Sequence, residues 1–108
     1  MSVLTEIVFK DADNPNIVNF FQDGAPMDFS TTSRMLLTFN GAGVSVDSNS
    51  NPPLIDWSGG SGEVVFDLGN VVIAKGSYPS TLKVYDGTHP DGQVITHPQG
   101  TGLTFKFV

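Results

Sequence analysis

The chain has 108 residues, of which 39% are hydrophobic and only 15% are charged, and its formal net charge is -6. This composition excludes a disordered chain, whose signature is low hydrophobicity with high charge, and the length suits one domain over residues 1–108. The absence of cysteine excludes a disulfide framework and a thiolate metal site.

The basic residues argue against a nucleic-acid partner, because a phosphate backbone is bound by a clustered basic face. Here they are scattered singly, at Lys10, Arg34, Lys75, Lys83 and Lys106. No apolar stretch reaches the ~18 residues of a membrane span. Residues 1–6 lack the basic and apolar regions of a signal peptide. We therefore expect a soluble protein that binds neither nucleic acid nor membrane and is not exported alone.

Short runs rich in Val, Ile, Phe and Thr follow one another, separated by 12 Gly and 7 Pro. Such residues pack well on a pleated sheet, so the runs are predicted strands. In chain order they are Leu4–Phe9, Ile17–Phe21, Arg34–Phe39, Val44–Asp47, Leu54–Trp57, Glu63–Leu68, Val71–Ile73, Thr81–Tyr85, Gln93–Thr96 and Leu103–Phe107. No segment of helical length carries apolar residues at helical spacing.

Three of these runs alternate between apolar and polar residues with period two. The predicted buried faces are Met35, Leu37 and Phe39 in the first, Val64, Phe66 and Leu68 in the second, and Leu103, Phe105 and Phe107 in the third. Alternation of this kind buries one face of a strand and leaves the other in water, which is typical of antiparallel sheets.

The connectors between the runs are typical of turns. Asp23-Gly24 and Asn40-Gly41 each offer a glycine for a left-handed backbone position. Proline cannot donate to a central ladder, so Pro79 is placed before the next predicted strand and not inside it. About seven to nine short strands at this spacing predict an all-β fold, a single Ig-like antiparallel β-sandwich.

Several motifs follow one another in a characteristic order. After Ile7-Val8-Phe9 comes a strand ending in Phe20-Phe21-Gln22, then the run Asp23–Ser30 with its Asp-Gly-Ala-Pro turn, then Arg34–Phe39. Later motifs are Ile55-Asp56-Trp57, Gly62–Leu68 and Val72–Pro79. Together they resemble a phage baseplate-type Ig-like domain, such as the N-terminal domain of baseplate upper proteins. The resemblance implies other phage structural proteins as partners, with the host cytoplasm before assembly and the virion tail afterwards as the location.

The acidic segment Asp11–Asn16 is a candidate calcium loop, because it places oxygen side chains at alternating positions. The candidate ligands are Asp11, Asp13 and Asn14. The EF-hand pattern fails, since a proline occupies its fifth place. A turn in which Asx side chains bond nearby amides is the reading that we favour, with no bound metal.

No pattern in the sequence is specific for catalysis. His89 and His97 each precede a proline and lack a His-x-x-x-His helix, so loop histidines are favoured over a metal site. No serine lies in a Gly-x-Ser-x-Gly elbow, and neither Gly41–Gly43 nor Gly59–Gly62 carries the Lys of a phosphate loop. We expect a protein that is not an enzyme and that holds no cofactor.

Aromatic side chains are the candidates for partner contact, because a ring offers both area and a stacking face. Phe20 and Phe21 are adjacent in one predicted strand and point to opposite faces, so one ring is expected to be exposed. With Phe29, these are the predicted contact residues. Trp57 is expected instead to fill the core from a central strand, as in Ig domains.

The predicted function is docking within a phage or prophage tail, as a structural or accessory component. Edge strands and exposed apolar loops are expected to contact neighbouring subunits, and the acidic surface to keep the protein soluble before assembly. The alternative is a carbohydrate- or cell-surface-binding β-sandwich module that uses loop aromatics.

Overall fold

The computed structural model of the chain describes residues 3–22, 24–49, 53–57, 62–96 and 102–108, and within these ranges every regular element is a β-strand. The described strands number eleven, of which nine have three residues or more. The all-β prediction is confirmed. The predicted count of seven to nine is exceeded by two strands of two residues each.

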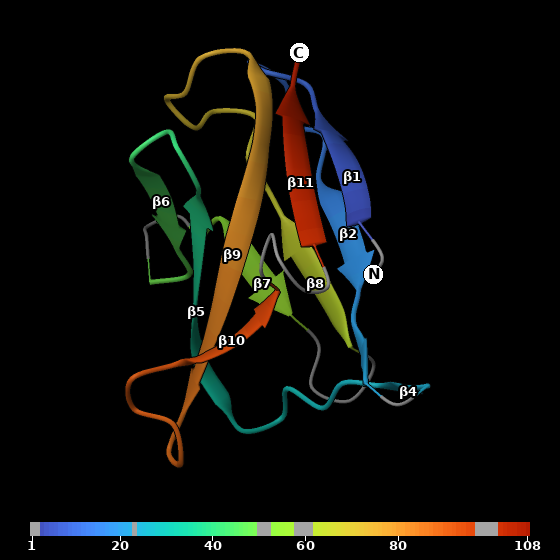
Figure 1. Ribbon diagram of the computed structural model, residues 1–108, viewed down its shortest axis with the longest axis vertical. Coiled ribbons are helices and arrows are strands. Elements are labelled where there is room, and N and C mark those ends of the chain that lie inside the picture. Colours follow the sequence, from blue (N-terminus) through green and yellow to red (C-terminus); the bar gives the residue numbers. More distant parts are fainter. Residues whose placement is uncertain (1–2, 23, 50–52, 58–61, 97–101) are drawn as a thin grey trace.

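The larger sheet, sheet A, is built around one long strand. Its described strands are β1 (Val3–Val8), β5 (Thr32–Phe39), β6 (Val44–Asp47), β9 (Gly76–Asp86), β10 (Gln93–Thr96) and β11 (Gly102–Phe107). Their order is β1-β11-β9-β5-β6, with β10 also paired to β9. One edge of β9 pairs with β5 and the other is shared by β11 and β10, so β9 organises the layer (Figure 1).

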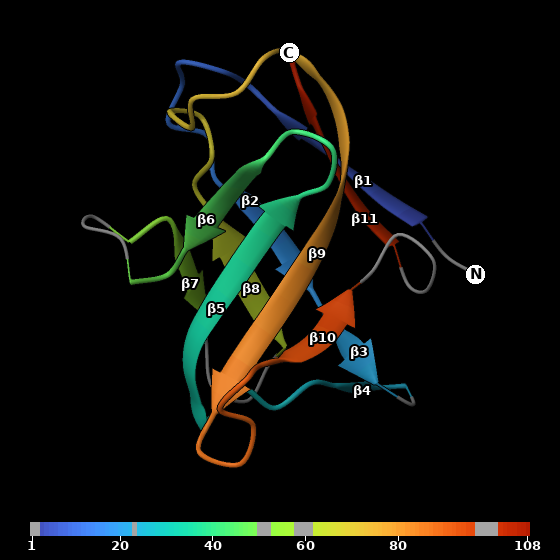
Figure 2. The same cartoon turned by 60° about the vertical axis from the view of Figure 1, so that its left-hand side comes forward.

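The smaller sheet, sheet B, lies behind sheet A (Figures 1 and 2). Its described strands are β2 (Asn16–Asn19), β7 (Ile55–Trp57) and β8 (Glu63–Phe66), in the order β2-β8-β7. A separate hairpin is formed by β3 (Phe21–Gln22) and β4 (Ala25–Pro26). The two sheets form a sandwich-like arrangement, and the more specific Ig-like assignment stays a prediction.

One pairing corrects the antiparallel prediction. β1 lies parallel to β11, in register from Val3 opposite Gly102 to Val8 opposite Phe107. The other pairings of the described strands are antiparallel. Parallel neighbours need a long connection, and these two strands come from opposite ends of the chain. Alternation reports which face of a strand is buried, and it carries no information on which strand lies beside it.

The predicted strand Ile17–Phe21 is interrupted at Phe20. The amide of Phe20 donates to the Gly62 carbonyl (2.8 Å), and its own carbonyl accepts from the Met27 amide (2.9 Å). The chain therefore leaves β8 at this residue and begins the β3–β4 hairpin. A run of apolar residues conceals such a break, since both halves satisfy the strand pattern.

The predicted strand Val71–Ile73 was wrong, because these residues form no strand. The Val71 amide bonds the carbonyl of Leu68 (3.1 Å) in a turn, and the Lys10 ammonium donates to the Ile73 carbonyl. Val72 is 92% exposed. Local and side-chain hydrogen bonds thus take the place of a ladder.

Pro79 lies inside β9, whose start at Gly76 precedes the predicted start at Thr81. The carbonyl of Pro79 accepts from the Asn40 amide (2.9 Å), on the side of β5. The N–H and C=O of an antiparallel strand residue point to the same neighbour, so the N–H that proline lacks would also face this side. The ladder between β5 and β9 ends at the pair of Phe39 with Ser80, which lies next to Pro79. The proline therefore removes no hydrogen bond from this ladder.

One hydrophobic core lies between the sheets. The nine side chains predicted to face inward from three strands are each at most 2% exposed, which confirms the alternation. Phe39 sits among aromatic neighbours, with its ring centroid 5.9 Å from that of Phe105 and 5.4 Å from that of Phe107. The rings of Phe66 in sheet B and Phe105 in sheet A lie 5.2 Å apart and join the two layers.

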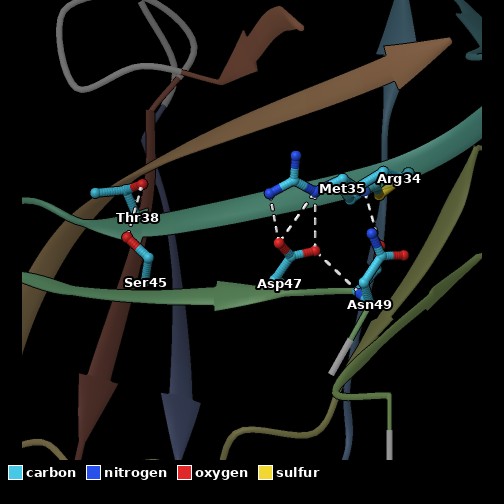
Figure 3. A network of polar contacts seen from close by, with 7 residues as sticks. Arg34, Met35, Thr38, Ser45, Asp47 and Asn49 are labelled. Atoms are coloured by element: carbon cyan, nitrogen blue, oxygen red, sulfur yellow. Dashed lines mark hydrogen bonds and ion pairs between the residues drawn. The ribbon is translucent and has the colours of Figure 1, made fainter. Parts of the chain in front are cut away.

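The outer face of sheet A carries a polar network between β5 and β6 (Figure 3). The Arg34 Nε donates to both carboxylate oxygens of Asp47 at 3.0 Å, and the guanidinium carbon lies 4.7 Å from the centre of the Tyr85 ring. The hydrogen bonds from Arg34 hold the pKa of Asp47 below its ordinary value of 3.8, and the Asn49 amide adds to this effect.

This ion pair predicts a pH dependence of stability. Because the folded pKa of Asp47 is lowered, its contribution is present above the unfolded pKa near 3.8 and is lost as the pH falls through the folded value. We expect Asp47→Asn to cost about 0.2–1 kcal/mol at neutral pH, as for other exposed pairs. Its melting temperature should then fall less than that of the wild type on acidification, as followed by circular dichroism.

The exposed Asp13→Asn variant is the control, since Asp13 lies away from this network. Its melting temperature should follow the wild-type curve at every pH. Curves for wild type and Asp47→Asn that run parallel down to about pH 2 would contradict the assignment.

Candidate docking groove

The β3–β4 hairpin projects from the side of the sandwich (Figure 2). All four residues of its strands are exposed. Gln22 pairs with Ala25, and Gly24 in the connection has a φ of 80°, a left-handed value that glycine adopts without strain. At the base, the rings of Phe20 and Phe29 meet edge to face with centroids 6.3 Å apart, which anchors the hairpin to the core.

Two adjoining hollows lie beside this hairpin, of about 220 and 260 Å³. They share Phe21, Met27 and Ile95, so they form one continuous depression. We call it the Phe21 groove, and its principal apolar lining is Leu4, Phe20, Phe21, Met27, Val94 and Ile95. Among the described residues, no charged side chain lines either hollow.

Three apolar side chains of the groove are exposed to water, beside the polar side chains of Asn19, Gln22 and Gln93. Phe21 is 62% exposed, and Leu4 and Val94 are each 45% exposed. Contiguous exposed apolar side chains mark interaction sites. Each of the two hollows by itself is smaller than the ~300–1,000 Å³ of a typical small-molecule pocket, and each suits an apolar side chain of a partner.

The three predicted contact residues have different environments. The expectation that one ring of the Phe20–Phe21 pair is exposed is confirmed, and the exposed ring is Phe21. Phe20 is half-buried and lines the groove. Phe29 is only 2% exposed, so its prediction as a contact residue was wrong. It packs in the core because Phe20 lies against it.

Other groove residues were missed by sequence reasoning. Leu4, Met27 and Ile95 come from the first strand, the end of the hairpin and β10, and no local pattern links them. The one available signal in the sequence was the predicted strand Gln93–Thr96. In the structure this strand is β10, and its residues Gln93 and Val94 are exposed.

Trp57 is not the central core residue that was predicted. It ends β7, which pairs only with β8 in the described part of sheet B, and it is half-buried at the margin of the core. The interior positions are filled by phenylalanines, with Phe39, Phe66 and Phe105 each 0% exposed. The centre of the core is therefore occupied by phenylalanine rings rather than by the indole of Trp57.

A larger hollow of about 560 Å³ lies between the 69–75 segment and the β5–β6 connection. Two of its polar side chains, those of Lys10 and Tyr78, bond to backbone carbonyls of the 69–75 segment. The Lys10 ammonium donates to the Ile73 carbonyl, and the Tyr78 hydroxyl donates to the Ala74 carbonyl at 2.8 Å. These two groups are therefore used within the wall of the hollow, where they would otherwise be able to orient a ligand.

The segment Asp11–Asn16 begins in a turn, as we favoured. Asp11 has a φ of 61°, and its amide donates to the Gly69 carbonyl at 2.8 Å. The Asn16 side chain donates to the Ile7 carbonyl at 2.8 Å. Over the described ranges, no three His, Cys, Asp or Glu side chains gather in a way that would hold a metal ion.

His89 lies in a loop that is held by hydrogen bonds to Asp86. The Asp86 carboxylate lies 2.9 Å from its Nδ1 and accepts from the His89 and Thr88 amides at 2.8 and 2.9 Å. Burial alone would raise the pKa of Asp86, but these hydrogen bonds outweigh it and lower the pKa. His97 lies outside the described residues.

Comparison of the chain with protein-family models, curated proteins and solved structures gives no significant match in any of the three. The resemblance to phage baseplate domains therefore stays a prediction. Nor does the described part of the chain contain a helix of the length and apolarity that a membrane span requires.

Proposed function

We propose that this chain is a non-enzymatic docking domain that binds a neighbouring protein subunit through the Phe21 groove. The observation that supports this most directly is an exposed aromatic ring beside a largely apolar hollow whose described lining carries no charged side chain. The chain has a net charge of -6 and 11 carboxylates, and none of the described carboxylates lines this hollow. The chemistry that fits it is an apolar side chain, presented by a partner of low local charge.

The energetics require the whole groove rather than one ring. Fully burying a phenylalanine side chain stabilises by about 1.5–3 kcal/mol. Association costs at least ~4 kcal/mol in lost freedom of motion. Phe21 alone therefore falls short, and the exposed Leu4 and Val94 beside it supply further apolar area.

The biological setting that we propose is a phage or prophage tail, in which the partner is another structural protein. This part of the proposal rests on the order of motifs from Ile7 to Phe107. The groove is compatible with it, because aromatic side chains and few charges are typical of the centre of a protein–protein interface.

The test is binding to identified proteins encoded beside this gene. Each neighbour is purified, mixed with the chain, and examined by native mass spectrometry and calorimetry. We expect one tail protein to bind, and Phe21→Ser to weaken binding about tenfold or more, as for truncation of an interface aromatic. Folding should be unaffected, since an exposed substitution costs within about 0.5 kcal/mol.

Phe9→Ser is the matched control, because Phe9 is 51% exposed and does not line the groove. It should bind as the wild type does. Equal affinities of Phe21→Ser and wild type for every neighbour would refute the groove as the docking site. Glycan-array binding that is lost in Phe21→Ser would instead establish the carbohydrate-binding alternative, in which the ring stacks on a sugar.

A further inference from the structure

The outer faces of the two sheets carry opposite charge. The outward side chains of sheet A include Arg34, Lys83 and Lys106, with Asp47 on β6 bound to Arg34. Those of sheet B include Asp56 and Glu63, and no Lys or Arg faces outward from its described strands. The sandwich is therefore positive on one broad face and negative on the other.

Two carboxylates of sheet B lie beside an apolar centre. Val65 in the middle strand lies opposite Ile17 on one side and Asp56 on the other. Glu63 lies two residues before Val65 on the same face, about 7 Å away along the strand. Ile17 is 53% exposed, so water covers an aliphatic surface here.

The outer face of sheet A has complementary features. Lys106 lies opposite Ile7 of β1, which is 42% exposed, and Lys83 lies opposite Leu36 of β5. Neither lysine forms an ion pair with any described residue. These two charges thus remain available, whereas that of Arg34 is neutralised within the face.

We propose that the outer face of sheet B docks onto the outer face of sheet A of a second copy of this chain, so that copies stack head to tail. The complementary charge supports this occupant, and two like faces would repel one another. The molecule measures 35 by 34 Å across these faces and 23 Å through them. The broad side of the molecule that carries each sheet has room for the ~800 Å² per partner of a standard interface, of which the three short strands of sheet B supply only the centre.

This geometry has two consequences. An interface between different surfaces of one chain repeats from copy to copy, and it produces a ring if the rotation closes or a filament if it does not. The net charge of -6 opposes stacking over longer distances. Association is therefore weak and depends on salt, because added ions screen the paired charges.

The test is self-association measured by sedimentation velocity over a concentration series, at about 0.05 M and about 0.5 M salt. One variant reverses the sheet B face (Asp56→Lys with Glu63→Lys), and another reverses the sheet A face (Lys83→Glu with Lys106→Glu). We expect the wild type to associate, less so in high salt. Each variant alone should associate about tenfold more weakly or worse.

An equimolar mixture of the two variants should recover association. The unchanged sheet A face of the first variant meets the unchanged sheet B face of the second, and the two reversed faces also match in charge. The pair Asp13→Lys with Asp91→Lys is the control, because it changes the net charge as the sheet B variant does but at exposed positions away from both sheet faces. It should not weaken association.

A wild type that stays monomeric throughout overturns the proposal, as does a mixture that stays monomeric although both variants melt cooperatively. If either double variant fails to fold, the single variants Glu63→Lys and Lys106→Glu replace the double variants, and they are measured separately and mixed in the same way. The result is independent of the Phe21 groove, since Phe21→Ser leaves both faces unchanged and should stack as the wild type does.

Discussion

Deletion of Leu103–Val108 should leave a chain that no longer folds cooperatively. The deletion removes nearly all of β11, which lies between β1 and β9, so β1 loses its only partner in the described part of sheet A. It also removes Phe105 and Phe107, which are at most 1% exposed. Loss of one such ring costs about 3–5 kcal/mol, against a total stability of about 5–15 kcal/mol. Thermal circular dichroism is the measurement.

The control for this deletion is Lys106→Ala, since the Lys106 side chain points outward from the same strand. The free energy of unfolding of this variant, measured by urea denaturation, should lie within about 0.5 kcal/mol of that of the wild type. A truncated chain that melts in one sharp transition would show that β11 is not part of the core.

Substitution of Phe39 by alanine is the second large effect, with an expected cost of about 3–5 kcal/mol. Phe39 is 0% exposed, and its ring packs against those of Tyr78, Phe105 and Phe107 at centroid distances of 6.4, 5.9 and 5.4 Å. Edge-to-face pairs add about 0.5–1.5 kcal/mol each beyond the buried area, and one substitution removes three of them. Urea denaturation measures the loss.

Phe9→Ala is the control for Phe39→Ala, because it removes the same atoms from a ring that is 51% exposed. The urea concentration at the midpoint of its unfolding should stay close to that of the wild type. If Phe39→Ala unfolds the chain outright, the milder Phe39→Leu places the effect on a measurable scale, with an expected cost of about 1–2 kcal/mol. Equal stability of Phe39→Ala and Phe9→Ala would contradict the central place of Phe39.

The inward faces of β5, β8 and β11 were predictable from the sequence. In each strand the apolar side chains recur every second residue, and the pleat sends these to one side. The exposure of one ring in the Phe20–Phe21 pair follows from the same rule. It does not say which ring is exposed, and only the contact of Phe20 with Phe29 decided that.

The candidate site was only partly predictable. Phe21 was named from its type and neighbours, but Leu4 and Ile95 lie far from it in the chain and reach the groove through the pairing of β1 with β11 and of β10 with β9. Phe29 and Trp57 were misplaced for one reason. Burial of an aromatic residue depends on what covers its strand, and a single strand's composition does not contain that information.

By itself the sequence determined the strand class, most strand positions and the buried face of each alternating strand, because these follow from backbone periodicity and from the cost of leaving apolar side chains in water. Only the tertiary structure decided the parallel β1–β11 pairing, the Phe21 groove and the opposed charges of the two faces. Gly69 illustrates the difference. The sequence shows a turn residue, but in the fold a Cβ there would lie 1.9 Å from the Ala12 carbonyl oxygen. Contacts between distant segments arise from packing, which no local pattern encodes.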